Sequence, residues 1–198
     1  FDGPVYGVEP ATRMRAAADD TASHPGVTYL DGAAERIPLP DASCDLVLMY
    51  LSFHHVRDRV AGAREIARVL RPSPCGRVLV RSTFADRMPD LLWHRYFPRA
   101  RAIEEDVFPS VAEVERVFAA VGLRRLALEP VRHRMAPSLG EYAARLRHRA
   151  ISTFEHMTED EIAEGFTVLE RDAAADTEPR PVEEDCDLLV LGGLARHT

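Results

Sequence analysis

Three residue types are missing from this sequence of 198 residues: it has no lysine, no asparagine and no glutamine, so all 25 of its Lys+Arg positions are arginine. We attribute this to the coding bias of a GC-rich genome and infer no chemistry from it. Long apolar runs are missing too. No run approaches the roughly 20 residues that a membrane-spanning helix needs, so the sequence predicts no membrane partner.

Cysteine is scarce, and a concentration of positive charge is absent. Cys44, Cys75 and Cys186 are widely spaced, without a metal-ligand spacing or a disulfide framework, so we expect no metal site and a reducing, cytoplasmic location. The net charge is -7. The arginine-rich stretch 145–149 could contact phosphates, but it is more typical of a solvated helix face. We therefore expect no nucleic-acid partner.

What is present is an alternation of short apolar strands and helices, which predicts an α/β fold with parallel pairing. Residues 37–41 hold two prolines and predict a loop. Capping boxes begin at Ser110, Ser138 and Thr158, and Gly122 ends the first of those helices. The predicted strands are 4–9, 27–30, 45–51, 77–81, 123–131 and 186–191. The predicted helices are 12–18, 59–70, 111–121, 138–150 and 159–174, with a charged loop over 173–184.

The run DLVLMYL at 45–51 is apolar throughout, which predicts a strand buried on both faces. In open α/β sheets, ligands bind beyond the carboxyl ends of the strands. This rule selects Glu9, the loop 31–36, the segment 50–55 and the residues after Thr83 as candidates. Glu9 could accept two hydrogen bonds from the hydroxyls of a ribose. The alternative is an exposed glutamate in a turn.

Three segments between residues 4 and 85 resemble motifs of class I S-adenosylmethionine-dependent methyltransferases, in the family's order and spacing. Val5 to Pro10, with Met14 beyond, resembles the second family motif. Gly32 to Asp45 resembles "G-D-A-E-x-L-P-x-x-D-x-S-F-D". Arg64 to Val80 resembles "E-x-x-R-V-L-x-P-G-G-x-L". The similarity is greatest to the bacterial small-molecule group called type 11.

The resemblance implies a fold: a three-layer Rossmann-like sheet, mostly parallel with an antiparallel last strand. It also implies a single methyltransferase domain over 1–198, with a cofactor-binding half at 1–85. The C-terminal half, 86–198, would carry lid-like helical insertions. The family pattern begins with a strand and a Gly-rich "D-x-G-x-G-x-G" loop that this sequence does not contain. We therefore expect the N-terminal strand and helices to be missing here and the natural protein to be longer.

The resemblance also implies a cofactor, S-adenosylmethionine, with S-adenosylhomocysteine as its product. Glu9 would bind the ribose, Pro10 and Met14 would pack on the adenine, and Ala34 would meet the adenine edge through its N–H. Two residues at the end of the buried strand, Tyr50 and Leu51, would line the methionine arm. The family often has Asp where this chain has Ala33, and that Asp would accept a hydrogen bond from the adenine amino group. In this chain the acceptor would be Glu35, the backbone or water, or the hydrogen bond would be lost. The turn at 73–75 is longer than the pattern.

Methyl transfer from a sulfonium needs mainly positioning and exclusion of water, and a base only where the acceptor starts protonated. His54 or His55 could be that base. Alternatively, they cap the strand and hold the loop. We assign the acceptor pocket to Phe53 and to the aromatic residues of segment 91–98, Trp93, Tyr96 and Phe97. For the latter three, core packing or a contact in a homodimer is the alternative.

These observations predict transfer of a methyl group to an O, N or C atom of a small-molecule acceptor. A non-catalytic methyltransferase-like binding protein is one rival, because Ala33 and the absent Gly-rich loop both weaken the cofactor site. An NAD-dependent oxidoreductase is another, since it shares the ribose-binding acid. The 35–43 loop and the helix end at 68–72 fit the methyltransferase pattern better.

Overall fold

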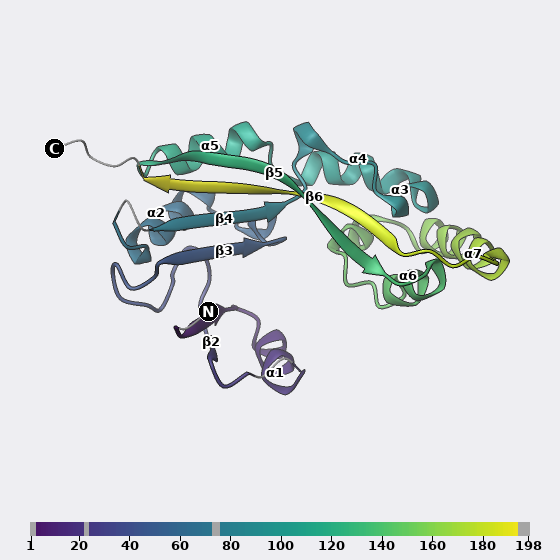
Figure 1. Ribbon diagram of the computed structural model, residues 1–198, viewed down its shortest axis with the longest axis horizontal. Helices are drawn as coiled ribbons and strands as arrows, with labels where there is room; N and C mark the ends of the chain where they lie inside the picture. Colours follow the sequence, from purple (N-terminus) through teal and green to yellow (C-terminus); the bar gives the residue numbers. More distant parts are fainter. Residues whose placement is uncertain (1–2, 22–23, 73–75, 194–198) are drawn as a thin grey trace. The chain divides into compact units, whose positions relative to one another are not determined.

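The computed structural model describes residues 3–21, 24–72 and 76–193. One of the three cysteines, Cys75, lies outside these residues, as does the lengthened turn at 73–75. The strands form two sheets (Figure 1). In the first, β1 (Val5–Val8) and β2 (Val27–Leu30) pair in parallel, with Val5 opposite Val27 and Val8 opposite Leu30.

The second sheet has four strands in the order β3-β4-β6-β5. In Figure 1 the arrow of β6 points opposite to those of β3 and β4, so the sheet is mixed. This confirms the α/β class and the reversed last strand that the sequence predicted. The strand bounds are Leu46–Tyr50 for β3, Arg77–Ser82 for β4, Leu123–Ala136 for β5 and Val182–Gly193 for β6.

The predicted helix starts are confirmed by side-chain caps. Ser110 Oγ accepts the N–H of Glu113 at 3.1 Å, and Ser138 Oγ accepts that of Glu141 at 3.2 Å. Thr158 forms a reciprocal capping box with Glu161. The helices are α1 (Thr12–Thr21), α2 (Arg59–Val69), α3 (Leu92–Tyr96), α4 (Pro98–Val107), α5 (Val111–Ala119), α6 (Leu139–Leu146) and α7 (Glu159–Ala175), with 3-10 turns at Phe53–His55, Ala85–Arg87 and Ser152–His156.

The chain divides into two compact units, each with its own core. Unit 1 comprises Phe1–Val80, Glu115–Leu126 and Val190–Thr198, and unit 2 comprises Arg81–Val114 and Ala127–Leu189. The core of unit 1 is aliphatic with two phenylalanines; its buried members include Phe53, Ile66, Val69, Val78, Val80, Phe118 and Leu191. The core of unit 2 is aromatic and includes Trp93, Phe97, Phe154 and Phe166. These units do not follow the expected boundary between residues 85 and 86.

One prediction about β3 is wrong: the strand is not buried on both faces. Met49 is buried, but the side chains of Leu48 and Tyr50 are 55% and 49% exposed. The physical reason is its position, because among the described residues β3 is the edge of the four-stranded sheet and pairs with β4 alone. An apolar run has the same composition whether its strand is central or at an edge.

The second half also differs from the sequence prediction at its polar segments. The strand expected over 123–131 continues to Ala136, and the strand expected from Cys186 begins at Val182. The loop expected over 173–184 is therefore wrong except for 176–181. Helices α3 and α4 were not predicted at all. The start of α4 did carry a signal, since Pro98 is its first residue, where proline fits a helix best.

Candidate functional site

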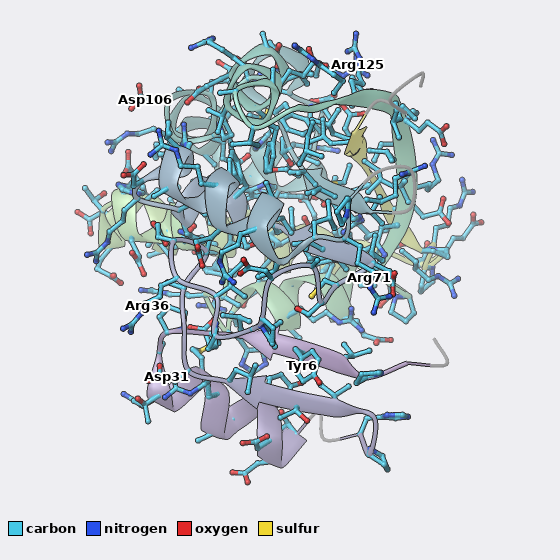
Figure 2. The ribbon with its side chains drawn as sticks, turned by 90° about the vertical axis from the view of Figure 1, so that its left-hand side faces the viewer. Tyr6, Asp31, Arg36, Arg71, Asp106 and Arg125 are labelled. Carbon is cyan, nitrogen blue, oxygen red and sulfur yellow. The ribbon has the colours of Figure 1, made fainter. Side chains whose placement is uncertain are left out.

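The carboxyl ends of β1 and β2 lie at the same edge, because these strands are parallel. The N–H of Glu9 donates to the carbonyl of Leu30 at 3.1 Å. Arg15 joins both ends: its Nη1 donates to the Glu9 carbonyl at 2.7 Å and pairs with Asp31 Oδ1 at 2.9 Å. Figure 2 shows Tyr6 on this two-stranded sheet, and Asp31 and Arg36 in the loop that follows β2. Two of the predicted site segments therefore meet.

The Glu9 carboxylate is half-buried at the start of α1. Its Oε1 accepts the N–H of Ala11 at 2.8 Å, which orients the side chain. Within the described residues, Oε2 has no hydrogen-bond donor in place. A carboxylate held by one oxygen, with the other oxygen available, fits a group with two neighbouring hydroxyls.

The loop 31–36 folds tightly on itself. Ala33 and Arg36 exchange backbone hydrogen bonds of 3.3 and 2.9 Å, and Ala34 lies at the tip of this turn. Gly32 is needed at its base, because a Cβ there would lie 2.7 Å from Pro38 Cδ and 3.0 Å from the Arg36 carbonyl oxygen. The close approach of backbone in this loop is what a flat ligand against main chain requires.

A clamp on α2, formed by Arg68 and Glu65, holds the next stretch of the loop. Arg68 donates to the carbonyls of Ile37 and Leu39, both at 2.9 Å, and to Asp41 Oδ1 at 2.7 Å. Glu65 Oε2 accepts from Arg68 and from the N–H of Ile37, and the guanidinium lowers the pKa of this carboxyl. Sequence reasoning missed this clamp, although both residues belong to the motif running from Arg64.

Exposed apolar side chains gather on the segments predicted to hold the cofactor. Met14 is 62% exposed, Tyr50 49% and Leu51 41%, and Pro10 is exposed as well. Leu51 also has φ of 47°, a left-handed conformation that is uncommon for a non-glycine residue. Strained backbone of this kind tends to occur at binding sites. Large apolar side chains left open to water favour a ligand that covers them.

The histidines follow β3 in the short 3-10 turn. The rings of His54 and His55 lie 3.9 Å apart between centroids. Burial lowers the pKa of His54 to about 4, with smaller contributions from His55 and from the Arg59 cation. His54 is therefore a neutral imidazole at neutral pH, with a lone pair that can accept a proton or a hydrogen bond.

This lowered pKa predicts a pH dependence of stability. Between pH 6.5 and about 4 the unfolded chain protonates His54 while the folded chain does not, so the free energy of unfolding falls as the pH falls through this window. The loss attributable to His54 is on the order of 3 kcal/mol at most. Urea unfolding of the wild type and of His54→Gln at pH 4.5 and 7 measures it. Equal pH dependence in the two proteins would contradict the expectation.

The residues assigned to the acceptor pocket are buried. Phe53 is 1% exposed and packs on Phe118, with ring centroids 5.6 Å apart. Trp93, Tyr96 and Phe97 are 2%, 5% and 0% exposed and belong to the core of unit 2. Their burial supports the core-packing alternative.

A depression in unit 2 lies where the site rule pointed, directly after β4. It has a volume of about 400 Å³ and is lined by Thr83, Asp86, Arg87, Met88, Pro89, Pro130, Asp185 and Asp187. Its carboxylates have partners: Asp187 pairs with Arg87 at 2.6 Å, Asp185 pairs with Arg132 at 3.1 Å, and Asp86 accepts the N–H of Val111. The side chains that line it could not be assembled from sequence, since they are up to about a hundred residues apart.

Within 3–21, 24–72 and 76–193, no three His, Cys, Asp or Glu side chains are grouped as metal ligands would be. No helix in these ranges has the length and hydropathy to cross a bilayer.

Comparison with known proteins agrees with the motifs. A family profile described as "methyltransferase domain" matches residues 1–77. The ubiquinone/menaquinone biosynthesis C-methyltransferase UbiE of Caulobacter vibrioides is 35% identical over 71 residues, which are 36% of this chain and 28% of that protein. The uncharacterized methyltransferase YcgJ of Bacillus subtilis is 34% identical over 88 residues, 43% of this chain and 34% of that protein. The match thus spans about a third or less of these curated relatives.

The fold is similar over a longer range. A solved structure from Anabaena variabilis, described as a methyltransferase from an antibiotic biosynthesis pathway, superimposes with a TM-score of 0.73 at 20% identity. The superposition covers 96% of this chain and 81% of that one. At this identity the likeness shows the fold alone. Residues 1–77 thus match a methyltransferase domain, and the motifs and the sheet topology agree with the class I S-adenosylmethionine-dependent methyltransferases.

Proposed function

We propose that the full-length protein transfers a methyl group from S-adenosylmethionine to an O, N or C atom of a small molecule, in the cytoplasm. Three features of unit 1, each following the carboxyl end of a strand, support this proposal. Glu9 has one carboxylate oxygen engaged, residues 33–36 form a tight backbone turn, and the side chains of Met14, Tyr50 and Leu51 are exposed. For the cellular location, the support is that Cys44 and Cys186 are free thiols.

These residues suit the three chemical parts of the cofactor. Glu9 Oε2 would accept from the ribose hydroxyls, and the side chains of Pro10 and Met14 would cover one face of the adenine. The backbone of Ala33 and Ala34 would meet the adenine edge, with the half-buried Glu35 beside it. Tyr50 and Leu51 would line the methionine arm. The cofactor supplies a methyl group already activated on sulfur, so the chain's own task is positioning and exclusion of water.

If the acceptor must lose a proton, the residues placed to take it are in the 3-10 turn that carries His54 and His55, which we call the histidine turn. His54 is unprotonated at neutral pH because its pKa is lowered to about 4, and a base with so low a pKa is a weak one. It would serve best where the acceptor loses its proton late, or where a hydrogen bond alone is needed. The relative UbiE is named a C-methyltransferase, which supports carbon as one candidate atom.

Titration calorimetry of S-adenosylhomocysteine into the full-length protein tests the cofactor site. We expect micromolar affinity, about -8 kcal/mol, for the wild type. Glu9→Ala should bind about 100-fold more weakly, because two hydrogen bonds to a charged acceptor contribute about 3 kcal/mol. Asp20→Ala removes an exposed carboxylate of α1 and should bind as the wild type does.

Other outcomes point to the rival functions. Absence of heat with the wild type would overturn the cofactor assignment, and NADH binding seen by fluorescence would favour the oxidoreductase. Cofactor binding without turnover on any acceptor would favour a non-catalytic binding protein, although Glu9→Ala would still bind more weakly.

A further inference from the structure

Glu35 makes a contact that joins two separate parts of the candidate site. Its Oε1 accepts the backbone N–H of Arg57 at 3.0 Å and that of Asp58 at 3.1 Å. Glu35 belongs to the tight turn at 33–36, whereas Arg57 and Asp58 end the segment that carries His54 and His55. One carboxylate therefore ties the loop expected beside the adenine to the histidine turn.

Packing supports the same connection. Gly62, in the first half of α2, leaves room for both parts: a Cβ there would lie 3.1 Å from Val56 Cγ1 and 3.6 Å from the Ala34 side chain. Val56 follows His55 directly, and Ala34 precedes Glu35. The tip of the loop and the end of the histidine turn thus rest on the same face of the helix, at its N-terminal end.

Capping α2 does not by itself require Glu35. The helix has its own N-cap residue, Asp58, whose Oδ1 accepts from Val60 at 3.1 Å and from Ala61 at 2.9 Å. The two N–H groups that Glu35 binds come just before the helix. Their carboxylate partner gains from the positive helix end. What it fixes is the short segment that leads from the 3-10 turn of His54 and His55 into the helix.

Resting on the proposed function, we propose that Glu35 is a positioning residue that couples the cofactor loop to the histidine turn. A cofactor seated against Ala33 and Ala34 presses on the turn that contains Glu35. Through Glu35 the same displacement reaches residues 57–58, and so the orientation of the His54 and His55 rings. Glu35 acts through these residues and needs no contact with the acceptor.

Histidine ring NMR tests this without a known acceptor. In the ligand-free protein, Glu35→Ala should raise the pKa of His54 by about one unit or more, towards its ordinary value, because the freed turn exposes the ring to water. Addition of S-adenosylhomocysteine should shift the His54 and His55 signals of the wild type. In Glu35→Ala these shifts should be lost or fall to less than about a third of the wild-type size. The signals are assigned with His54→Gln and His55→Gln.

Two further variants separate positioning from stability. Glu35→Gln keeps an acceptor oxygen for both N–H groups and should restore the pKa and the shifts. Asp58→Ala removes the helix cap and should lower the melting temperature, yet leave both histidine readouts close to wild type. Unchanged histidines in Glu35→Ala, or equal effects of Glu35→Ala and Asp58→Ala, would overturn the coupling.

Failure of the proposed function gives a different result. If the wild type does not bind S-adenosylhomocysteine, the cofactor assignment falls, and with it the ligand-induced part of the coupling. The pKa of His54 in the ligand-free variants still shows whether Glu35 holds the turn. If the wild type binds S-adenosylhomocysteine and the His54 and His55 signals of Glu35→Ala behave as in the wild type, the coupling is rejected and the cofactor assignment stands.

Discussion

Glu104→Ala should destabilise unit 2 by about 3–5 kcal/mol, because it leaves two buried polar partners unsatisfied at about 1–3 kcal/mol each. Glu104 is 3% exposed on α4. Its Oε2 lies 2.7 Å from His94 Nε2, and its Oε1 accepts from Thr153 Oγ1 at 3.2 Å. The substitution leaves both partners buried without their acceptor. His94 Nδ1 is already buried without a hydrogen-bond partner in the described residues.

The neighbouring carboxylate provides a matched control. Glu105 lies on the same helix with a side chain that is 45% exposed, and it pairs with Arg101 at 2.9 Å. Glu105→Ala should cost less than about 1 kcal/mol, because exposed pairs contribute little. Glu104→Gln keeps an oxygen acceptor, so its loss of stability should lie between those of Glu104→Ala and Glu105→Ala.

Urea unfolding followed by tryptophan fluorescence measures these differences. Trp93 is the only tryptophan of the chain and is 2% exposed, with its ring centroid 5.6 Å from that of His94. It therefore reports directly on the core that surrounds Glu104. A loss below about 1 kcal/mol for Glu104→Ala, equal to that of Glu105→Ala, would show that the pair adds no net stability.

The sequence predicted elements whose apolar residues follow a strict period. In the helix predicted over 159–174, Ile162, Phe166 and Leu169 recur at helical spacing, and they are 1%, 1% and 0% exposed in α7. Capping boxes located the helix starts to the residue, because they depend on contacts only three positions apart. Such local signals need no knowledge of the rest of the fold.

Elements that depend on distant neighbours could not be read in the same way. The extensions of β5 and β6 are polar, and in them cross-strand pairs such as Arg132 with Asp185 replace apolar burial. The exposure of Leu48 follows from the edge position of β3, which only the strand order reveals. Likewise, the buried contact between His94 and Glu104 has no sequence pattern that separates it from a solvated pair on a helix surface.

In the candidate site, too, local features could be predicted from the sequence and contacts between distant residues could not. Strand ends and family motifs predicted Glu9, the loop 31–36 and the histidine turn, and the structure places them in unit 1. The contacts that fix these segments were not predicted. Glu35 reaches backbone groups 22 and 23 residues away, and Arg68 holds carbonyls 29 and 31 residues before it. A charged side chain in a motif can bind a ligand or its own backbone, and only tertiary structure decides between these.

Gly165→Ala should destabilise the protein by about 2–3 kcal/mol, although alanine is the better helix former by about 1 kcal/mol. Gly165 is buried in α7, and a Cβ there would overlap the ring atoms Cδ1 and Cε1 of Phe97 and lie 2.7 Å from the Tyr96 carbonyl oxygen. Neither can yield at low cost. Phe97 is fully buried, and the ring centroids of Phe154 and Phe166 each lie 5.2 Å from its own. The contact with Tyr96 is to a backbone oxygen, which cannot move as a side chain can.

Gly140→Ala is the matched substitution in a helix without that constraint. A Cβ on Gly140, in α6, would have Ser138 Oγ at 3.9 Å as its sole neighbour within 4 Å. The variant should therefore gain about 0.5–1 kcal/mol from helix propensity and reduced freedom of the unfolded chain. Opposite signs in urea unfolding would separate packing from propensity. A gain for both variants would mean that α7 and Phe97 can move apart, so that the close approach of Gly165 is not what fixes this helix.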